Sequence, residues 1–169
     1  MIFLSLLFGS VLWREEFIDD RLSVQQLNEY TVNIQLNNSC LYLKGNPEAE
    51  GFSCAWFYLD KDIKLTEDEI LEIYIRVIGV NTRLKYFYEK QNSAVYWGSE
   101  VIVKTSPEWQ RIKLPLSEAK PFYSSTFPFA LTPDKTPVLY LFIDNSTPGY
   151  FDTEIDYIAI IKADTYKEE

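Results

Sequence analysis

Histidine is absent from this chain of 169 residues, and cysteine and methionine are scarce, with two and one respectively. Without histidine the chain lacks the usual general base near neutral pH, the usual zinc ligand and every Ser–His or Cys–His pair. Cys40 and Cys54 cannot form a metal site alone. Because they flank a predicted hairpin, both a disulfide and two buried, reduced thiols stay open as alternatives.

Positive charge is also in short supply. Lys and Arg total 16 against 25 Asp and Glu, which gives a net charge of −9. This balance argues against a nucleic-acid partner and suits solubility, cations or neutral ligands.

The chain has no apolar run long enough to span a bilayer. Its opening, MIFLSLLFGSVLW, is apolar for about a dozen residues, which is too short to cross a membrane, and it lacks a basic n-region. We therefore divide the chain into an apolar N-terminal segment, residues 1–12, and a single domain, residues 13–169. The segment is a first strand, a strand donated to a neighbouring subunit in self-association, or a signal remnant.

Aromatic residues, by contrast, make up 16% of the chain, and short apolar alternations recur between turn signals. These predicted strands cover residues 31–36, 40–45, 52–60, 70–79, 83–90, 99–105, 108–116, 137–145 and 149–161. A helix-capping pattern, TEDE at 66–69, competes, but the run that follows has period two and predicts a strand. We expect an all-β fold, an antiparallel two-sheet β-sandwich of the jelly-roll type.

The last predicted strand changes phase. Phe151, Thr153 and Ile155 alternate in one phase, and Ile158 and Ile160 alternate in the other. A side-chain period of two cannot switch phase without an extra residue, so a β-bulge is expected at or beside Asp156.

Two stretches, SPEWQRIKLPLSEAKPF and PVLYLFIDNSTPGYFDTEIDYIAI, resemble galactose-binding-like jelly rolls used as carbohydrate-binding modules. They are also similar to the complex I intermediate-associated protein 30 domain. The matching residues are Trp109, Pro115, Leu116, Ser117, Phe151, Ile155, Asp156 and Ile158. The resemblance covers nearly the whole chain and implies a galactose-binding-domain-like fold.

The resemblance also implies a structural Ca²⁺ between the first and last strands. Glu16 and Asp156 match the positions of the carboxylate ligands, with Glu15 as a register alternative to Glu16. Ca²⁺ takes six to eight oxygens, some of which an irregular backbone supplies. The alternative is that Asp156 only stabilises the bulge through backbone N–H groups.

A glycan site would need aromatic rings on the face of a sheet that is turned away from the core. Alternation turns Tyr74 and Arg76 outward if the apolar residues of 70–79 face inward. We also expect Tyr86, Tyr88 and Tyr140 to point outward, with Phe87, Trp13, Trp56, Trp97 and Trp109 in the core. The predicted carbohydrate-binding residues are Tyr74, Arg76, Tyr86, Tyr88 and Tyr140.

The sequence thus predicts a non-catalytic protein that binds a glycan or polysaccharide by aromatic stacking and hydrogen bonds. The alternative is a structural subunit of an extracellular filament, coat or surface structure. Sequons at Asn37 and Asn145 favour an extracellular or cell-surface location. No carboxylate pair stands in a distinctive catalytic context.

Overall fold

The computed structural model describes residues 10–17, 23–25, 32–37, 39–45, 52–58, 65–89, 96–122, 138–145 and 149–163. Regular structure in these residues is β-strand apart from one short 3-10 helix, η1 (Leu116–Glu118). The strands are β1 (Val11–Glu15), β2 (Ser23–Gln25), β3 (Val32–Asn37), β4 (Cys40–Gly45), β5 (Phe52–Tyr58), β6 (Glu69–Gly79), β7 (Thr82–Glu89), β8 (Tyr96–Val103), β9 (Ser106–Pro115), β10 (Lys120–Phe122), β11 (Val138–Asn145) and β12 (Phe151–Lys162). The predicted all-β fold is confirmed.

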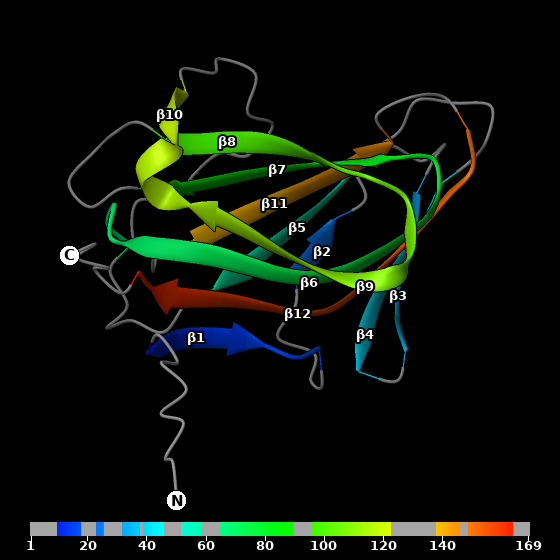
Figure 1. The fold of residues 1–169 in the computed structure, drawn as a ribbon, viewed down its shortest axis with the longest axis horizontal. Coiled ribbons are helices and arrows are strands. Elements are labelled where there is room, and N and C mark those ends of the chain that lie inside the picture. Colours follow the sequence, from blue (N-terminus) through cyan, green and yellow to red (C-terminus); the bar gives the residue numbers. More distant parts are fainter. Residues whose placement is uncertain are drawn as a thin grey trace, which may run out of the picture.

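The strands form two six-stranded antiparallel sheets, which lie one behind the other in Figure 1. Sheet A has the order β3-β4-β12-β6-β9, and β1 also pairs with β12. Sheet B has the order β10-β8-β7-β11-β5-β2. We call the face of each sheet that is turned away from the other sheet its outer face.

The core between the sheets follows from the alternation within each strand. On β6, Leu71, Ile73, Ile75 and Val77 are fully buried, as the period-two pattern predicted. Further almost fully buried aliphatic side chains come from both sheets and from the segments next to them: Leu41, Leu43, Leu65, Leu84, Val103, Leu116, Ile155, Ile158 and Ile160. Burying side chains of this size stabilises the fold by roughly 1.5–3 kcal/mol each.

Three hydrogen bonds from buried or part-buried hydroxyls link the two sheets. The side-chain oxygens of Thr82 on β7 and Thr153 on β12 lie 2.7 Å apart within the core. The hydroxyls of Tyr86 and Tyr88, also on β7, donate to the backbone oxygens of Pro115 (3.3 Å) and Leu116 (3.5 Å). Because these groups are paired, the core accommodates them without an unsatisfied polar atom.

The phase change in β12 is a β-bulge, as predicted. Ile155 pairs with Ile75 and Tyr157 pairs with Tyr74, so Asp156 is the extra residue. On the other side of β12, the partner changes at the same point. β4 pairs with Asp152–Ile155 and β1 pairs with Ile158–Ile161. The bulge therefore lies where β12 passes from one neighbour to the next, and it keeps Ile155 and Ile158 both in the core.

The helix-capping pattern at 66–69 forms its local hydrogen bonds without starting a helix. The carboxylate of Glu69 accepts the backbone N–H of Thr66 at 2.5 Å and the Thr66 hydroxyl at 2.8 Å. The next residues continue as β6, because their apolar period is two.

At the N-terminal end, β1 pairs with β12 of the same chain, so the two ends of the domain lie side by side as expected. Val11 and Leu12 belong to this strand, and residues 1–9 of the apolar segment lie outside the described residues. Cys40 is a free, buried cysteine on β4, which agrees with the reduced alternative. Among the residues that the structure describes, no helix is long and apolar enough to cross a membrane.

Candidate functional site

Three aromatic rings stand side by side on the outer face of sheet A. Tyr74 on β6 stacks on Trp109 of β9, with ring centroids 5.1 Å apart, and on Tyr157 of β12 at 5.5 Å. Neighbouring strands lie about 4.8 Å apart, so outward side chains at adjacent positions stand at stacking distance. We call Tyr157, Tyr74 and Trp109 the aromatic row.

Two guanidinium groups lie against the aromatic row. The Arg14 guanidinium is 4.0 Å from the ring centroid of Tyr157, and the Arg76 guanidinium is 5.1 Å from that of Trp109. Both distances are within the range of cation–π attraction. The row is therefore held by positive charge as well as by stacking.

Trp109 is the member of the aromatic row that lies on an edge strand, so its indole is the ring that a ligand can reach from beyond the sheet. Trp109 is partly exposed, and its strand, β9, is the last strand of sheet A in the described residues. Tyr74 and Arg76 both reach the indole from β6, and Arg76 also donates to Glu154 on β12, the strand on the far side of β6. The indole face turned away from β6 therefore points beyond the sheet edge. A planar face of this kind can receive the C–H face of a sugar ring.

The carboxylate of Glu72, next to the aromatic row, contacts one hydroxyl and two basic side chains. Glu72 Oε1 accepts the Tyr157 hydroxyl at 2.8 Å, and Glu72 is mostly buried. Arg111 Nε lies 3.8 Å from Oε1, and Lys113 Nζ lies 3.7 Å from Oε2. Burial and the hydrogen bond to Glu72 raise the pKa of the Tyr157 hydroxyl, so it stays a neutral donor.

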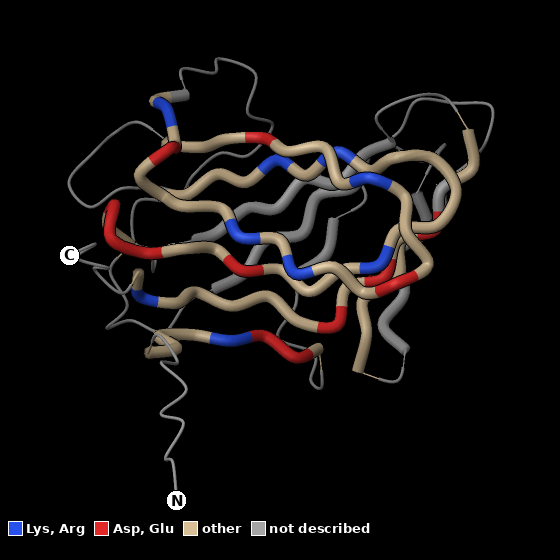
Figure 2. Tube along the Cα trace, in the orientation of Figure 1, with Lys and Arg blue, Asp and Glu red and all other residues tan. Residues whose placement is uncertain are grey.

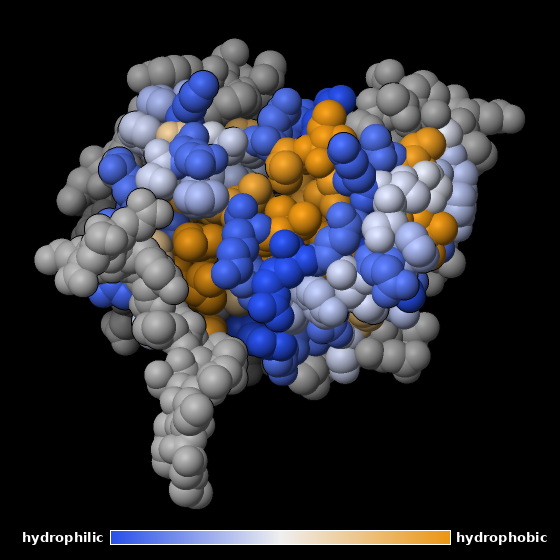
Figure 3. All heavy atoms as spheres, in the orientation of Figure 1, coloured by the Kyte–Doolittle hydropathy of each residue, from blue (hydrophilic) through white to orange (hydrophobic). Residues whose placement is uncertain are grey.

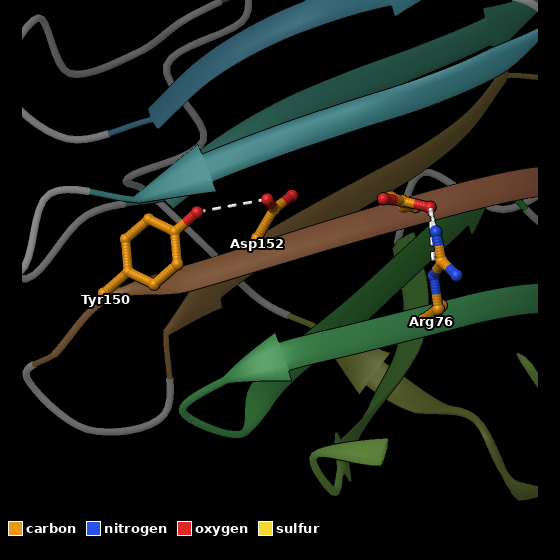
Figure 4. A network of polar contacts seen from close by, with 4 residues as sticks. Arg76, Tyr150 and Asp152 are labelled. Carbon is orange, nitrogen blue, oxygen red and sulfur yellow. Dashed lines mark hydrogen bonds and ion pairs between the residues drawn. The ribbon is translucent and has the colours of Figure 1, made fainter. Parts of the chain in front are cut away.

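Among the described residues of this face, Arg76 and Glu154 form the least exposed ion pair. Arg76 Nε donates to Glu154 Oε2 at 3.1 Å, and a second, shorter contact joins Nη2 to the same oxygen. Figure 4 shows this pair beside the hydrogen bond from the Tyr150 hydroxyl to Asp152 Oδ2, which is 3.1 Å long. Glu154 is 8% exposed, so it depends on Arg76 to offset its desolvation.

Seen in space-filling form, this face is mainly hydrophilic over β6 and β9, and an apolar area lies between β8 and β9 (Figure 3). The partly buried core residues Val101, Ile112 and Leu114 come from these two strands. The candidate site is thus a band of aromatic and charged groups bordered by an apolar area at the open edge of the sandwich.

Of the predicted glycan residues, Tyr74 and Arg76 point outward on β6, as expected. The expectation for Tyr86 and Tyr88 is wrong: they are 1% and 0% exposed and face the core. The inward side of β7 faces the end of β9 and η1, where the Tyr86 and Tyr88 hydroxyls donate to the backbone oxygens of Pro115 and Leu116. Burial raises the pKa of Tyr88 to about 12.

The five predicted residues therefore do not share one surface. Tyr74 and Arg76 belong to sheet A, whereas Tyr86, Tyr88 and Tyr140 lie on strands of sheet B. Tyr140 pairs with Phe87 in the β11–β7 register, and its side chain lies outside those that the structure describes. Phe87 itself is buried, at 9% exposed, but it alternates with Tyr86 and Tyr88 and lies on the outer face of sheet B.

The prediction that Trp109 belongs to the core is also wrong, because it lies on the outer face of sheet A. The signal was present in EWQRIKL, where Trp109, Arg111 and Lys113 share one phase and Ile112 and Leu114 the other. Trp13 and Trp97 do pack against the core. The side chain of Trp56 is outside the described set.

Tyr157 and Arg14 were also missed. The phase of Tyr157 depends on where the extra residue in β12 is placed, and the position of Arg14 depends on the pairing of β1 with β12.

The Ca²⁺ prediction is not decided by the described residues. Glu16 follows the β1–β12 pairing, which ends at Glu15 and Ile158, so its backbone is close to the bulge at Asp156. Its carboxylate lies 2.8 Å from Arg14 Nε, and the Glu15 carboxylate accepts the Phe17 N–H at 2.7 Å. Within the described part of the chain, no three Asp, Glu or Cys side chains gather as a metal site. A Ca²⁺ ion held by Glu16 and Asp156 would need further oxygens from backbone and water.

Comparison with known proteins identifies the architecture. No family model and no curated protein matches the sequence. Among solved structures, a family 11 carbohydrate-binding module of a cellulosomal cellulase from Clostridium thermocellum is similar, with a TM-score of 0.58 and 13% identity over 94% of this chain and 97% of that chain. The fold is the β-sandwich of carbohydrate-binding modules.

Two further structures agree with this fold. A family 30 carbohydrate-binding module of a cellulase from Clostridium thermocellum has a TM-score of 0.55 and 16% identity over 91% of this chain and all of that one. PfGH50B has a TM-score of 0.59 and 9% identity over 95% of this chain but 24% of its own. The matched part of PfGH50B is thus one portion of a longer chain, whereas the two modules match this chain over nearly their full length.

Proposed function

We propose that this protein binds a glycan without catalysis, on the outer face of sheet A, and that Trp109, at the edge of the aromatic row, provides the contact surface. The observation that carries the proposal is the indole of Trp109, which is partly exposed on the edge strand β9 and stacks on Tyr74. A pyranose ring stacks on such a face through its C–H groups. The similarity in fold to carbohydrate-binding modules supports this reading.

Polar groups around Trp109 complete the binding mode. Arg76, Arg111 and Lys113 donate hydrogen bonds to sugar hydroxyls or to ring and bridging oxygens. Glu72 and Glu154 form ion pairs with these cations. Both carboxylates are 8% exposed, so they are poorly accessible to a substrate and do not suit catalysis by paired carboxylates. Binding of this kind makes and breaks no covalent bond, and it suits a protein that meets polysaccharide outside the cell or at its surface.

The test compares soluble polysaccharides in affinity electrophoresis and titration calorimetry with wild type, Trp109→Ala and Glu100→Ala. Glu100 is the matched control, because it is 63% exposed on sheet B and far from the row in the pairing order. Loss of a stacking aromatic typically costs about 1–3 kcal/mol in ligand affinity, so Trp109→Ala should weaken binding by about 5- to 150-fold. Unchanged affinity in Trp109→Ala, measured on a folded variant, would overturn the proposed site.

A second candidate function is an assembly subunit, which the β1 edge of sheet A favours. Val11 is 56% exposed and Leu12 38% exposed on a strand that pairs with β12 on one side only in the described residues. An edge strand of this kind can extend its sheet with a second copy. Val11→Lys should convert a concentration-dependent oligomer to a monomer in analytical ultracentrifugation. A wild type that is monomeric at all concentrations would exclude this candidate.

A further inference from the structure

Basic side chains are concentrated on the candidate site, although the chain as a whole is acidic. Arg76 on β6 and Arg111 and Lys113 on β9 all project from the outer face of sheet A, and these strands are direct neighbours. Figure 2 shows the basic segments of β6 and β9 next to one another on this face. In a protein with a net charge of −9, three cations therefore lie on the two strands that carry Tyr74 and the partly exposed Trp109.

The acidic groups of this face only partly offset these cations. Arg111 and Lys113 share Glu72, at 3.8 Å and 3.7 Å, which is longer than a hydrogen bond. One oxygen of Glu72 already accepts the Tyr157 hydroxyl at 2.8 Å. The side chains of Arg111 and Lys113 are 60% and 53% exposed, so their donors face water and are accessible to a ligand.

The three residues Trp109, Arg111 and Lys113 also form a track along the edge strand. They alternate on the outer face of β9, so successive members are about 6.8 Å apart along the strand. A polysaccharide that stacks one sugar on Trp109 and runs along β9 brings its next substituents to Arg111 and Lys113. A guanidinium binds a carboxylate or sulfate through paired, charge-assisted hydrogen bonds, which are about twice as strong as those to a hydroxyl.

We propose that the ligand is an acidic polysaccharide, whose carboxylate or sulfate groups bind Arg111 and Lys113 while one sugar stacks on Trp109. This inference rests on the proposed glycan-binding function and names its substrate class. The acidity of the rest of the chain does not oppose it at physiological salt, where charges more than about 8 Å away are largely screened.

The experiment uses a matched pair of ligands, polygalacturonate and the same polymer with its carboxylates reduced to hydroxymethyl groups. Sulfated dextran and plain dextran form a second pair that separates sulfate from carboxylate. The protein variants are Arg111→Gln/Lys113→Gln and the control Lys85→Gln/Lys120→Gln, which removes the same charge from sheet B. Affinities come from calorimetry at fixed ionic strength, and circular dichroism checks that each variant is folded.

We expect wild type to bind at least one acidic polymer about tenfold more tightly than its neutral partner, as one to two charged hydrogen bonds predict. The Arg111→Gln/Lys113→Gln variant should lose this preference and bind the acidic polymer and its neutral partner with equal affinity, and the control should match wild type. Equal wild-type affinity for the acidic and neutral members of both pairs would overturn the acidic ligand and leave the proposed function standing. If Arg111→Gln/Lys113→Gln still prefers the acidic polymer, Arg111 and Lys113 do not bind its anionic groups, and the proposed acidic site is wrong. Absence of binding to every polymer tested, in a folded protein, would count against the proposed function itself.

Discussion

Gly98 is the position where the packing of sheet B allows the sharpest stability test. It lies on β8 opposite Phe87 of β7, and the ring of Phe87 covers it. A Cβ atom on Gly98 would overlap Cδ1 of Phe87 and the backbone oxygen of Tyr86, and would lie 2.8 Å from Phe87 Cε1. The ring can turn away, but the Tyr86 carbonyl belongs to a strand paired on both sides, so relief requires a backbone shift.

We therefore expect Gly98→Ala to destabilise the protein by about 2–3 kcal/mol, at the upper part of the range for overpacking. For a domain of this size, 1 kcal/mol shifts Tm by roughly 2–4 °C, so Tm should fall by roughly 4–12 °C. Scanning calorimetry and urea unfolding at neutral pH measure both quantities.

Glu100→Ala is the matched control, because Glu100 lies on the same strand and the same face, is 63% exposed, and loses only a 3.9 Å contact with Lys85. It should change stability by less than about 0.5 kcal/mol. In Gly98→Ala/Phe87→Leu the smaller side chain removes part of the overlap, so the two substitutions should be less damaging together than their sum. A Gly98→Ala protein as stable as Glu100→Ala would refute the close approach of Phe87 and with it the β7–β8 register.

Three further predictions follow from buried or charged groups. Arg76→Ala leaves Glu154 without its partner at 8% exposure and should cost about 1–3 kcal/mol in urea unfolding, whereas Glu154→Gln, which removes the charge, should cost less. Burial raises the pKa of Tyr88 to about 12 from an unfolded value near 10, so its stabilising contribution is complete below pH 10 and is lost between pH 10 and 12; Tyr88→Phe should flatten that part of the stability curve. Ca²⁺ should raise Tm and a chelator should lower it, with Glu16→Gln and Asp156→Asn each removing the shift; equal Tm values with Ca²⁺ and with chelator would dismiss the metal.

The sequence predicted most of the longer strands because they carry a strong local signal, whereas the three-residue strands β2 and β10 were not predicted. The period-two pattern of 70–79 identified both β6 and its buried face, and the phase change in 149–161 located the bulge at Asp156. The fold class followed from the number and spacing of such strands. These features depend on residues close together in the chain, which is where sequence patterns are informative.

The site was harder to predict because it depends on which strands are neighbours. Alternation shows that Tyr86 and Tyr88 share a face, but not that this face meets Pro115 and Leu116 across the core. Tyrosine tolerates both environments, since a buried hydroxyl needs only one acceptor. The aromatic row joins residues from β6, β9 and β12, and its members are up to 83 positions apart in the chain (Tyr74 to Tyr157). No local pattern contains that juxtaposition.

The central claim is that a glycan contacts the outer face of sheet A at Trp109, and an NMR titration of ¹⁵N-labelled protein with polygalacturonate oligomers tests it most directly. We predict that the indole N–H signal of Trp109 and the amide signals of Tyr74, Arg111 and Lys113 shift together with increasing ligand. Shifts confined to Lys85, Gly98 and Glu100, on the outer face of sheet B, would contradict the claim.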